Sequence, residues 1–170
     1  MQNTLMDLLG VEQILVNVDA KDAQEAIQKL TVALVETGHV APGFAEDVWK
    51  REQTFPTGLP TQPLAVAIPH ADPDHVNHSA VCIGVLNSPV RFAQMGTDGS
   101  VFLDVQLVFM LAIKEREKQV EMIQQLMAVI QNASLLDGLS KAKDSTEAFT
   151  LIQTMLAGKG NDEKNQFQGH

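Results

Sequence analysis

The residue best suited to chemistry is His70, which follows an apolar run at positions 64–68 and a proline at position 69. The run predicts a buried strand, the proline ends it, and the imidazole then stands at the strand's exit, where loops and clefts lie. Because the ordinary pKa of imidazole is about 6.5, much of it is neutral near pH 7 and can act as a nucleophile that accepts a phosphoryl group. The alternative is a structural histidine that caps a core strand, which is the usual interpretation of a lone histidine.

A second group of residues could bind an anion beside that imidazole. Arg51 offers a guanidinium fork that matches phosphoryl oxygens, the Thr57 hydroxyl can donate, and Gly58 lets its backbone amide approach an anion closely. Asp72 could hold the other ring nitrogen of His70 and fix the tautomer, although a backbone carbonyl would do equally well. The structural alternatives are an arginine that satisfies helix-terminal carbonyls and a Thr-Gly pair that only makes a turn.

Other chemistries have less support. Several possible metal ligands lie close together, namely His70, Asp72, Asp74, His75 and His78. Their H-x4-H-x2-H spacing matches no compact ligand signature, and Pro73 makes the segment a loop, so we expect neither a metal nor a cofactor. No G-x-S-x-G elbow or G-x-x-x-x-G-K-[ST] loop occurs, and Cys82 lies in an apolar strand, where thiols are usually inert.

Composition limits the classes of function. The 170 residues, 45% of them apolar, suit one domain with its own core. A net charge of −9 argues against binding to nucleic acid, which requires clustered basic residues, and favours protein or small-molecule partners. The single cysteine, the absence of a leader sequence and the absence of a long apolar run predict a cytoplasmic protein.

Periodicity predicts helices that flank a group of strands. We expect strands at 14–18, 64–68, 80–86, 90–92 and 101–113, and helices at about 23–37, 42–53, 120–130, 134–141 and 149–156. Asp19 and either Asp144 or Ser145 are the predicted caps of the first and last helices. The strand at 101–113 is apolar on both faces and should be central. These elements predict a single α/β domain at 1–157, with a mixed sheet flanked by helices on both faces, and a disordered polar tail at 158–170.

The motifs resemble those of the EIIA components of the fructose and mannitol class (EIIA type 2) in the bacterial sugar phosphotransferase system. The match comprises Arg51-Glu52, Pro56-Thr57-Gly58-Leu59, Val66-Ala67-Ile68-Pro69-His70, and the element order over about residues 10 to 156. In that family the histidine of the A-I-P-H motif takes a phosphoryl group from phosphohistidine in HPr. It then passes the group to a cysteine of a cognate EIIB, which phosphorylates the incoming sugar. The resemblance implies that His70 is phosphorylated, that Arg51 is its phosphate partner, and that membrane contact is only indirect, through EIIB and EIIC.

The chain departs from the family pattern at three positions. Many relatives have glycine at Ala71 and a small residue at Pro63, and relatives often have a second histidine where Gln119 aligns. A glutamine can donate an amide hydrogen bond to a phosphoryl oxygen but cannot carry positive charge, so Arg51 must supply more of the electrostatics. Gln119 and the stretch at 117–122 look closest to the galactitol-specific EIIA proteins.

Three hypotheses follow. The first is a phosphocarrier for uptake of a hexitol such as galactitol, with an apolar docking rim formed by Phe55, Leu59 and Ile113. The second is a regulatory EIIA-like protein in which phosphorylation of His70 controls a partner. The third is a non-catalytic binding domain with a structural His70. The short polar tail favours a free-standing protein, while the sugar, the phosphorylated ring nitrogen and the oligomeric state stay open.

Overall fold

The computed structural model describes residues 4–168 and has helices before and after a group of consecutive strands, as the periodicity predicted. The helices are α1 (Ala23–Glu36), α2 (Phe44–Thr54), α3 (Arg116–Ile130), α4 (Ala133–Ser140) and α5 (Ser145–Gln168). The strands are β1 (Ile14–Val18), β2 (Gly58–Leu59), β3 (Ala65–Ala67), β4 (Ala80–Ala93) and β5 (Phe102–Ala112). Short 3-10 helices occur at Leu5–Leu8, Val11–Gln13 and Pro73–His75.

The strands form one mixed five-stranded sheet in the order β1-β4-β5-β3-β2. β1 runs parallel to β4 and β3 runs parallel to β5, whereas β4–β5 and β2–β3 are antiparallel pairs. The predicted strands at 80–86 and 90–92 are one strand, because β4 continues through a register irregularity between Val85 and Val90. The gap expected between the two predicted strands is therefore only a bulge within β4.

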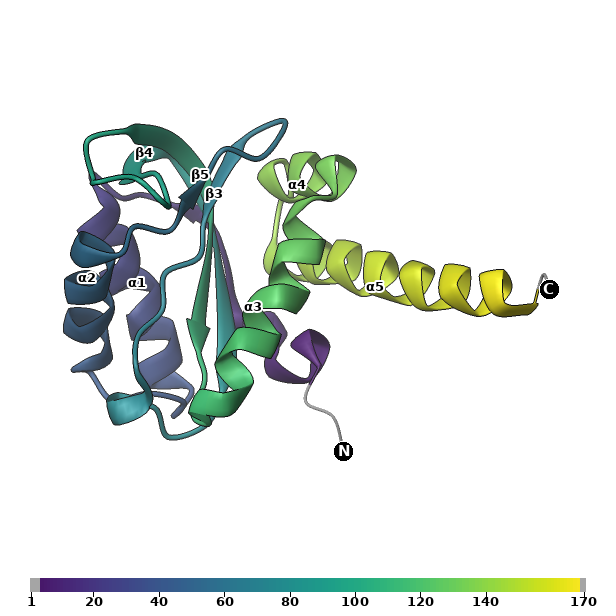
Figure 1. Ribbon diagram of the computed structural model, residues 1–170, viewed down its shortest axis with the longest axis horizontal. Coiled ribbons are helices and arrows are strands. Elements are labelled where there is room, and N and C mark those ends of the chain that lie inside the picture. Colours follow the sequence, from purple (N-terminus) through teal and green to yellow (C-terminus); the bar gives the residue numbers. More distant parts are fainter. Residues whose placement is uncertain (1–3, 169–170) are drawn as a thin grey trace.

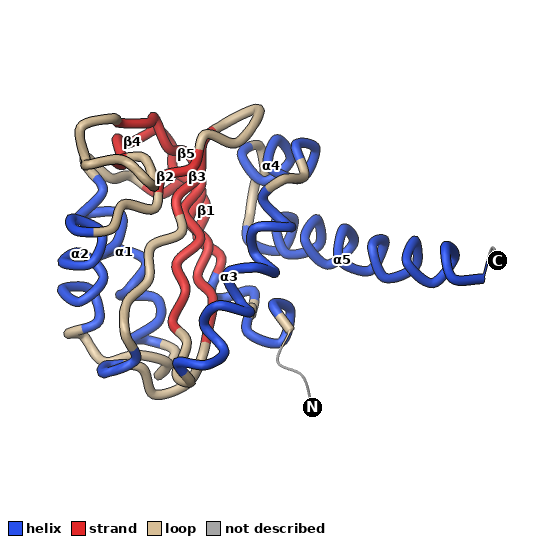
Figure 2. Tube along the Cα trace, viewed as in Figure 1, coloured by secondary structure: helices blue, strands red, loops and turns tan. Residues whose placement is uncertain are grey.

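Helices cover both faces of this sheet, as predicted. Figure 1 shows α1 and α2 on one face and α3, α4 and the start of α5 on the other, and Figure 2 shows the strands edge-on between these layers. β5 is central, and its side chains alternate between two cores: Leu107 and Phe109 face the α3–α5 side, while Val108 and Met110 face the α1–α2 side. A strand that is buried on both faces must be apolar throughout, which explains the long hydrophobic run.

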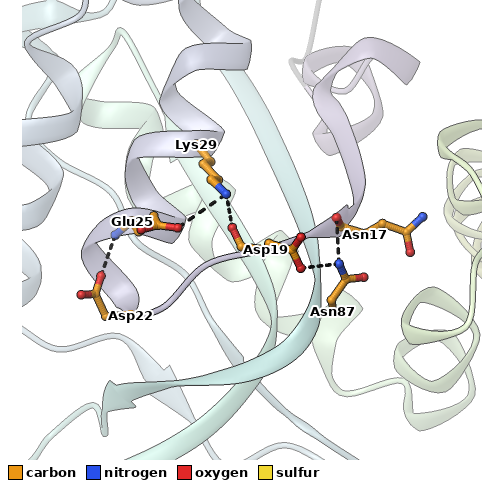
Figure 3. A network of polar contacts seen from close by, with 6 residues as sticks. All are labelled: Asn17, Asp19, Asp22, Glu25, Lys29 and Asn87. Carbon is orange, nitrogen blue, oxygen red and sulfur yellow. Dashed lines mark hydrogen bonds and ion pairs between the residues drawn. The ribbon is translucent and has the colours of Figure 1, made fainter.

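The cap of α1 differs from the prediction. The Asp22 carboxylate, rather than that of Asp19, accepts a hydrogen bond from the Glu25 amide at 2.9 Å and begins the helix. Asp19 instead accepts a hydrogen bond from the Asn87 side chain at 2.6 Å, and its carbonyl accepts one from Lys29 (Figure 3). These contacts tie the chain after β1 to β4 and to α1. At α5 the predicted Asp144 cap is confirmed, because its carboxylate accepts a hydrogen bond from the Glu147 amide at 2.8 Å.

The end of α5 also differs from the sequence prediction. The polar residues after position 157 were predicted to be disordered, whereas α5 continues as a helix to Gln168 and points away from the sheet (Figure 1). The earlier part of α5 already forms the helix, and each residue added to its end gains one backbone hydrogen bond. No proline interrupts this stretch. Positions 169 and 170 lie outside the described residues. The domain boundary at residue 157 stays a prediction, because helix continuity alone does not test it.

Candidate functional site

The end of β3 positions His70. Pro69 cannot donate a backbone hydrogen bond, so the regular strand stops before it. The Pro69 carbonyl still accepts a hydrogen bond from the Leu111 amide at 3.0 Å, and His70 forms an isolated bridge with Leu111 of β5. The central strand therefore holds the histidine's backbone in place after β3 has ended.

One nitrogen of the His70 ring is bound to the backbone. Nδ1 lies 2.8 Å from the Ile68 carbonyl oxygen, and because a carbonyl can only accept, Nδ1 must carry the hydrogen in this contact. In the neutral ring Nε2 then carries the lone pair. Among the described residues, none forms a hydrogen bond with Nε2. The side chain is buried, with 7% of the residue exposed. The contact that Asp72 was predicted to make is thus made by a backbone carbonyl, the other possibility that the sequence left open.

The electrostatic surroundings favour a neutral imidazole. Burial lowers the pKa of His70 below its ordinary value, and the positive charge of Arg51 acts in the same direction. The hydrogen bond to the Ile68 carbonyl and the charge of Asp72 oppose this shift but are outweighed. A neutral ring with its hydrogen on Nδ1 is the form in which Nε2 can act as a nucleophile.

Arg51 lies in the last turn of α2, as predicted, and faces a shallow cavity of about 190 Å³ next to Ala71. Its lining is charged and comprises Asp47, Lys50, Arg51, Ala71, Asp72 and Asp74. The guanidinium lies over the Phe55 ring, 5.2 Å from its centroid, and Nε is a buried donor without a hydrogen-bond partner. Because the charge of Arg51 acts on the His70 ring, its unpartnered N–H is a donor that a phosphoryl oxygen carried by His70 could satisfy.

Thr57 is in the site region but faces inward. Its hydroxyl lies 2.7 and 2.9 Å from the two carboxylate oxygens of Glu52, and its amide donates to the same carboxylate at 3.1 Å. The Ile68 amide donates to the Thr57 hydroxyl oxygen at 3.2 Å. Because these contacts use the single hydroxyl hydrogen, the predicted donation from Thr57 to a phosphoryl group does not fit this arrangement.

Gly58 is needed for packing. A Cβ at this position would lie 2.6 Å from the Ala93 carbonyl oxygen, so only glycine allows β2 to approach the end of β4 this closely. This close packing gives the glycine a structural reason, and the predicted contribution of its backbone amide to anion binding stays a prediction.

The remaining predicted site residues lie around the loop after His70. The Gln119 side-chain amide donates to the Ala71 carbonyl at 3.4 Å, which places the start of α3 beside the site. Asp72 is exposed, and its carboxylate lies 4.0 Å from Arg116. Among residues 4–168 no cluster of three or more potential ligands could hold a metal ion.

The predicted apolar rim is only partly found. Phe55 is 60% exposed and Leu59 is half-buried, but Ile113 is 2% exposed and belongs to the core on the α3–α5 side. An apolar residue at a strand end can be either rim or core, and only the packing of α3 decides which. No helix in the described part of the chain is both long and apolar enough to cross a membrane.

Sequence reasoning missed the part played by Glu52. It assigned this residue to the last turn of α2 without a role, yet the carboxyl is 6% exposed and is the acceptor for two Thr57 donors. Burial raises the pKa of Glu52 to about 7, against the opposing hydrogen bonds of Thr57 and the charge of Arg51. The only signal in the sequence was the spacing of Glu52 and Thr57, which are five residues apart with Pro56 between them.

Comparison with known protein families gives one family match. Residues 7–155 match the family described as "Phosphoenolpyruvate-dependent sugar phosphotransferase system, EIIA 2". The chain is 33% identical over 154 residues to the multiphosphoryl transfer protein of Shigella flexneri; the match covers 88% of this chain and 17% of that protein. The chain therefore spans about a sixth of the length of the first curated relatives it matches. It is also 30% identical over 105 residues to the galactitol-specific EIIA component of Escherichia coli K12, covering 59% of this chain and 69% of that one.

Solved structures show the same fold. The crystal structure of IIA mannitol from Escherichia coli superposes with a TM-score of 0.70 at 24% identity, covering 85% of this chain and 98% of that one. IIA-mannitol in the complex with phosphorylated IIB-mannitol from Escherichia coli gives a TM-score of 0.71 at 25% identity, covering 86% and 97%. The single α/β domain predicted from the sequence is thereby confirmed.

Proposed function

Because the chain belongs to the EIIA type 2 family of the phosphoenolpyruvate-dependent sugar phosphotransferase system, we propose that it is a phosphocarrier in which His70 is the phosphorylated residue. His70 accepts the phosphoryl group from phosphorylated HPr and passes it to a cysteine of a cognate EIIB. The observation that most supports this proposal is the contact between Nδ1 and the Ile68 carbonyl, which leaves the Nε2 lone pair for the reaction. The cytoplasmic location expected from the sequence is part of this proposal.

The proposed transfer has two steps. In each step one bond to phosphorus forms as another breaks, and no proton has to be moved. In the first, the Nε2 lone pair forms a bond to phosphorus while the P–N bond of the donor imidazole breaks, and the electron pair returns to the donor nitrogen. His70 keeps its Nδ1 hydrogen on the Ile68 carbonyl throughout. In the second step the P–N bond at Nε2 breaks and a P–S bond forms to the EIIB cysteine thiolate. The electron pair returns to Nε2, so the carrier is regenerated.

Arg51 stabilises the transferred group. In such a transfer the negative charge spreads over three oxygens that need donors close to the line of attack. The unpartnered Nε–H of Arg51 beside the site supplies one donor and a fixed positive charge. The contact of its guanidinium with Phe55 limits the freedom of the side chain before a partner arrives. Gln119 is held on the Ala71 carbonyl and supports the loop that carries His70.

The partners in this proposal are two proteins that dock in turn. The E. coli mannitol complex joins IIA with phosphorylated IIB, and this supports an EIIB as the acceptor for the present chain. Exposed Phe55, whose ring lies under the guanidinium of the cavity residue Arg51, provides the apolar part of a small, transient docking surface.

The test is incubation with phosphorylated HPr, followed by detection of a phosphoramidate on His70 by mass spectrometry and 31P NMR. His70→Ala should abolish labelling. His78→Ala, which removes an exposed histidine from the neighbouring loop, should leave labelling unchanged. Full labelling of the His70→Ala protein would refute the proposal.

Galactitol is the sugar that the proposal favours, through the 30% identity to the galactitol-specific EIIA component. A regulatory role is the second candidate, because the chain is also 29% identical over 118 residues to the transcriptional regulator ManR of Bacillus subtilis; the match covers 69% of this chain and 16% of that protein. Transfer from phosphorylated His70 to a panel of EIIB domains separates the two. Fastest transfer to a galactitol-type EIIB supports sugar uptake, whereas transfer to none supports the regulatory role.

A further inference from the structure

Glu52 forms a buried polar chain with Thr57 and Ile68, and this chain ends at His70. The Glu52 carboxylate accepts from the Thr57 hydroxyl, the hydroxyl oxygen accepts from the Ile68 amide, and the Ile68 carbonyl accepts from Nδ1 of His70. Glu52, Thr57 and His70 are all buried. A buried acid is costly to retain unless it is hydrogen-bonded, and a nonpolar residue would pack here without that cost.

Thr57 lies just beyond the paired residues of β2 and β3, and its side chain continues the hydrogen bonds between these two strands. β2 pairs with β3 through Gly58 and Ala67, and the next residues along, Thr57 and Ile68, lie outside both strands. The Thr57 hydroxyl accepts the Ile68 amide in place of a backbone carbonyl, so it extends the pairing by one residue. That residue is the one whose carbonyl holds the active imidazole.

Glu52 determines which way the Thr57 hydroxyl points. The hydroxyl has one hydrogen, and it can accept from Ile68 in a fixed geometry only if that hydrogen is directed elsewhere. In its ionised form, which prevails above its pKa of about 7, the Glu52 carboxylate presents acceptors alone and takes both the hydroxyl and the amide of Thr57. A glutamine would place an N–H near the hydroxyl oxygen, where it competes with the Ile68 amide.

We propose that Glu52 is a positioning residue for phosphoryl transfer, which acts through Thr57 and Ile68 to hold His70 with its hydrogen on Nδ1 and its lone pair on Nε2. The inference depends on the proposed function for its kinetic consequence. Glu52 itself does not touch the transferred group, because Thr57 and Ile68 stand between its carboxylate and the ring. Its effect is on the tautomer and orientation of the nucleophile.

Two measurements on matched variants test this role. The first is the rate of phosphoryl transfer from phosphorylated HPr, and the second is the tautomer of His70 from its ring 15N chemical shifts. We expect Glu52→Gln and Thr57→Val each to slow transfer on the order of tenfold and to reduce the Nδ1–H population. Thr57→Ser keeps the hydroxyl and should restore both. Glu46→Gln removes an exposed carboxylate from the same helix and should change neither.

The outcomes are separable. Wild-type rates and an unchanged tautomer in both Glu52→Gln and Thr57→Val would overturn the positioning role. If Glu52→Gln fails to fold, the comparison of Thr57→Val with Thr57→Ser decides the question. If the wild-type protein accepts no phosphoryl group, the proposed function fails; the tautomer measurement, made without HPr, still supports or refutes the action of Glu52 on His70.

Discussion

Replacement of Glu52 by glutamine should change how the stability of the protein depends on pH. Burial raises the pKa of this carboxyl from an ordinary 4.5 to about 7. The folded protein therefore binds the proton more tightly than the unfolded chain does, and the free energy of unfolding falls as pH rises between these two values. At 1.36 kcal/mol per pKa unit, the full loss above the folded pKa is about 3 kcal/mol.

Urea denaturation at pH 5 and at pH 8 measures this effect. Glu52→Gln lacks the titration, so its free energy of unfolding should fall by about 2.5 kcal/mol less than that of the wild type between these two pH values, because pH 5 already lies half a unit above the ordinary pKa. Glu46→Gln is the matched control, since Glu46 is exposed and pairs with Lys50 at 3.3 Å on the same helix. The control should keep the wild-type pH dependence. Equal pH dependence in the wild type and Glu52→Gln would refute the description of Glu52 as a buried acid that ionises near neutral pH.

Three further outcomes follow from the same structure. Arg51→Ala should slow transfer from phosphorylated HPr by tenfold or more without unfolding the domain, and Arg51→Lys should recover only part of the rate because it lacks the guanidinium fork; a collapse of Tm in circular dichroism would show that Arg51 is structural. The midpoint of His70 in an NMR titration should lie below 6.5, since burial lowers its pKa; a midpoint above 6.5 would contradict a neutral nucleophile. Gly58→Ala should cost about 1 to 3 kcal/mol in urea denaturation because its methyl group would lie against the Ala93 carbonyl, and an unchanged midpoint would contradict that close approach.

Residues with strong local patterns were placed correctly from the sequence. β5 was predicted to be central because a strand buried on both faces must be apolar on both, and it is the third of five strands. His70 was predicted at a strand exit because proline ends the preceding apolar run, and Arg51 was predicted in the last turn of its helix; both predictions are confirmed. These features depend on neighbours in the sequence, which periodicity and proline chemistry describe well.

The errors have a common cause in contacts between distant segments. Asp19 and Asp22 are both good caps, and the choice between them depends on Asn87 of β4, which engages Asp19. The inward direction of the Thr57 hydroxyl depends on the burial of Glu52, and burial is set by the tertiary fold. Ile113 was predicted in the rim but is core, because the helices on that face of the sheet cover the end of β5. None of these contacts leaves a periodic signal in the chain.

The most direct test of the central claim is to identify the His70 nitrogen that carries phosphorus. Protein labelled with 15N at histidine is phosphorylated by HPr, and the 15N–31P coupling and ring shifts are then recorded. Because Nδ1 holds its hydrogen on the Ile68 carbonyl, phosphorus should be attached to Nε2, with Nδ1 still protonated. Phosphorus on Nδ1, or on any histidine other than His70, would contradict the account.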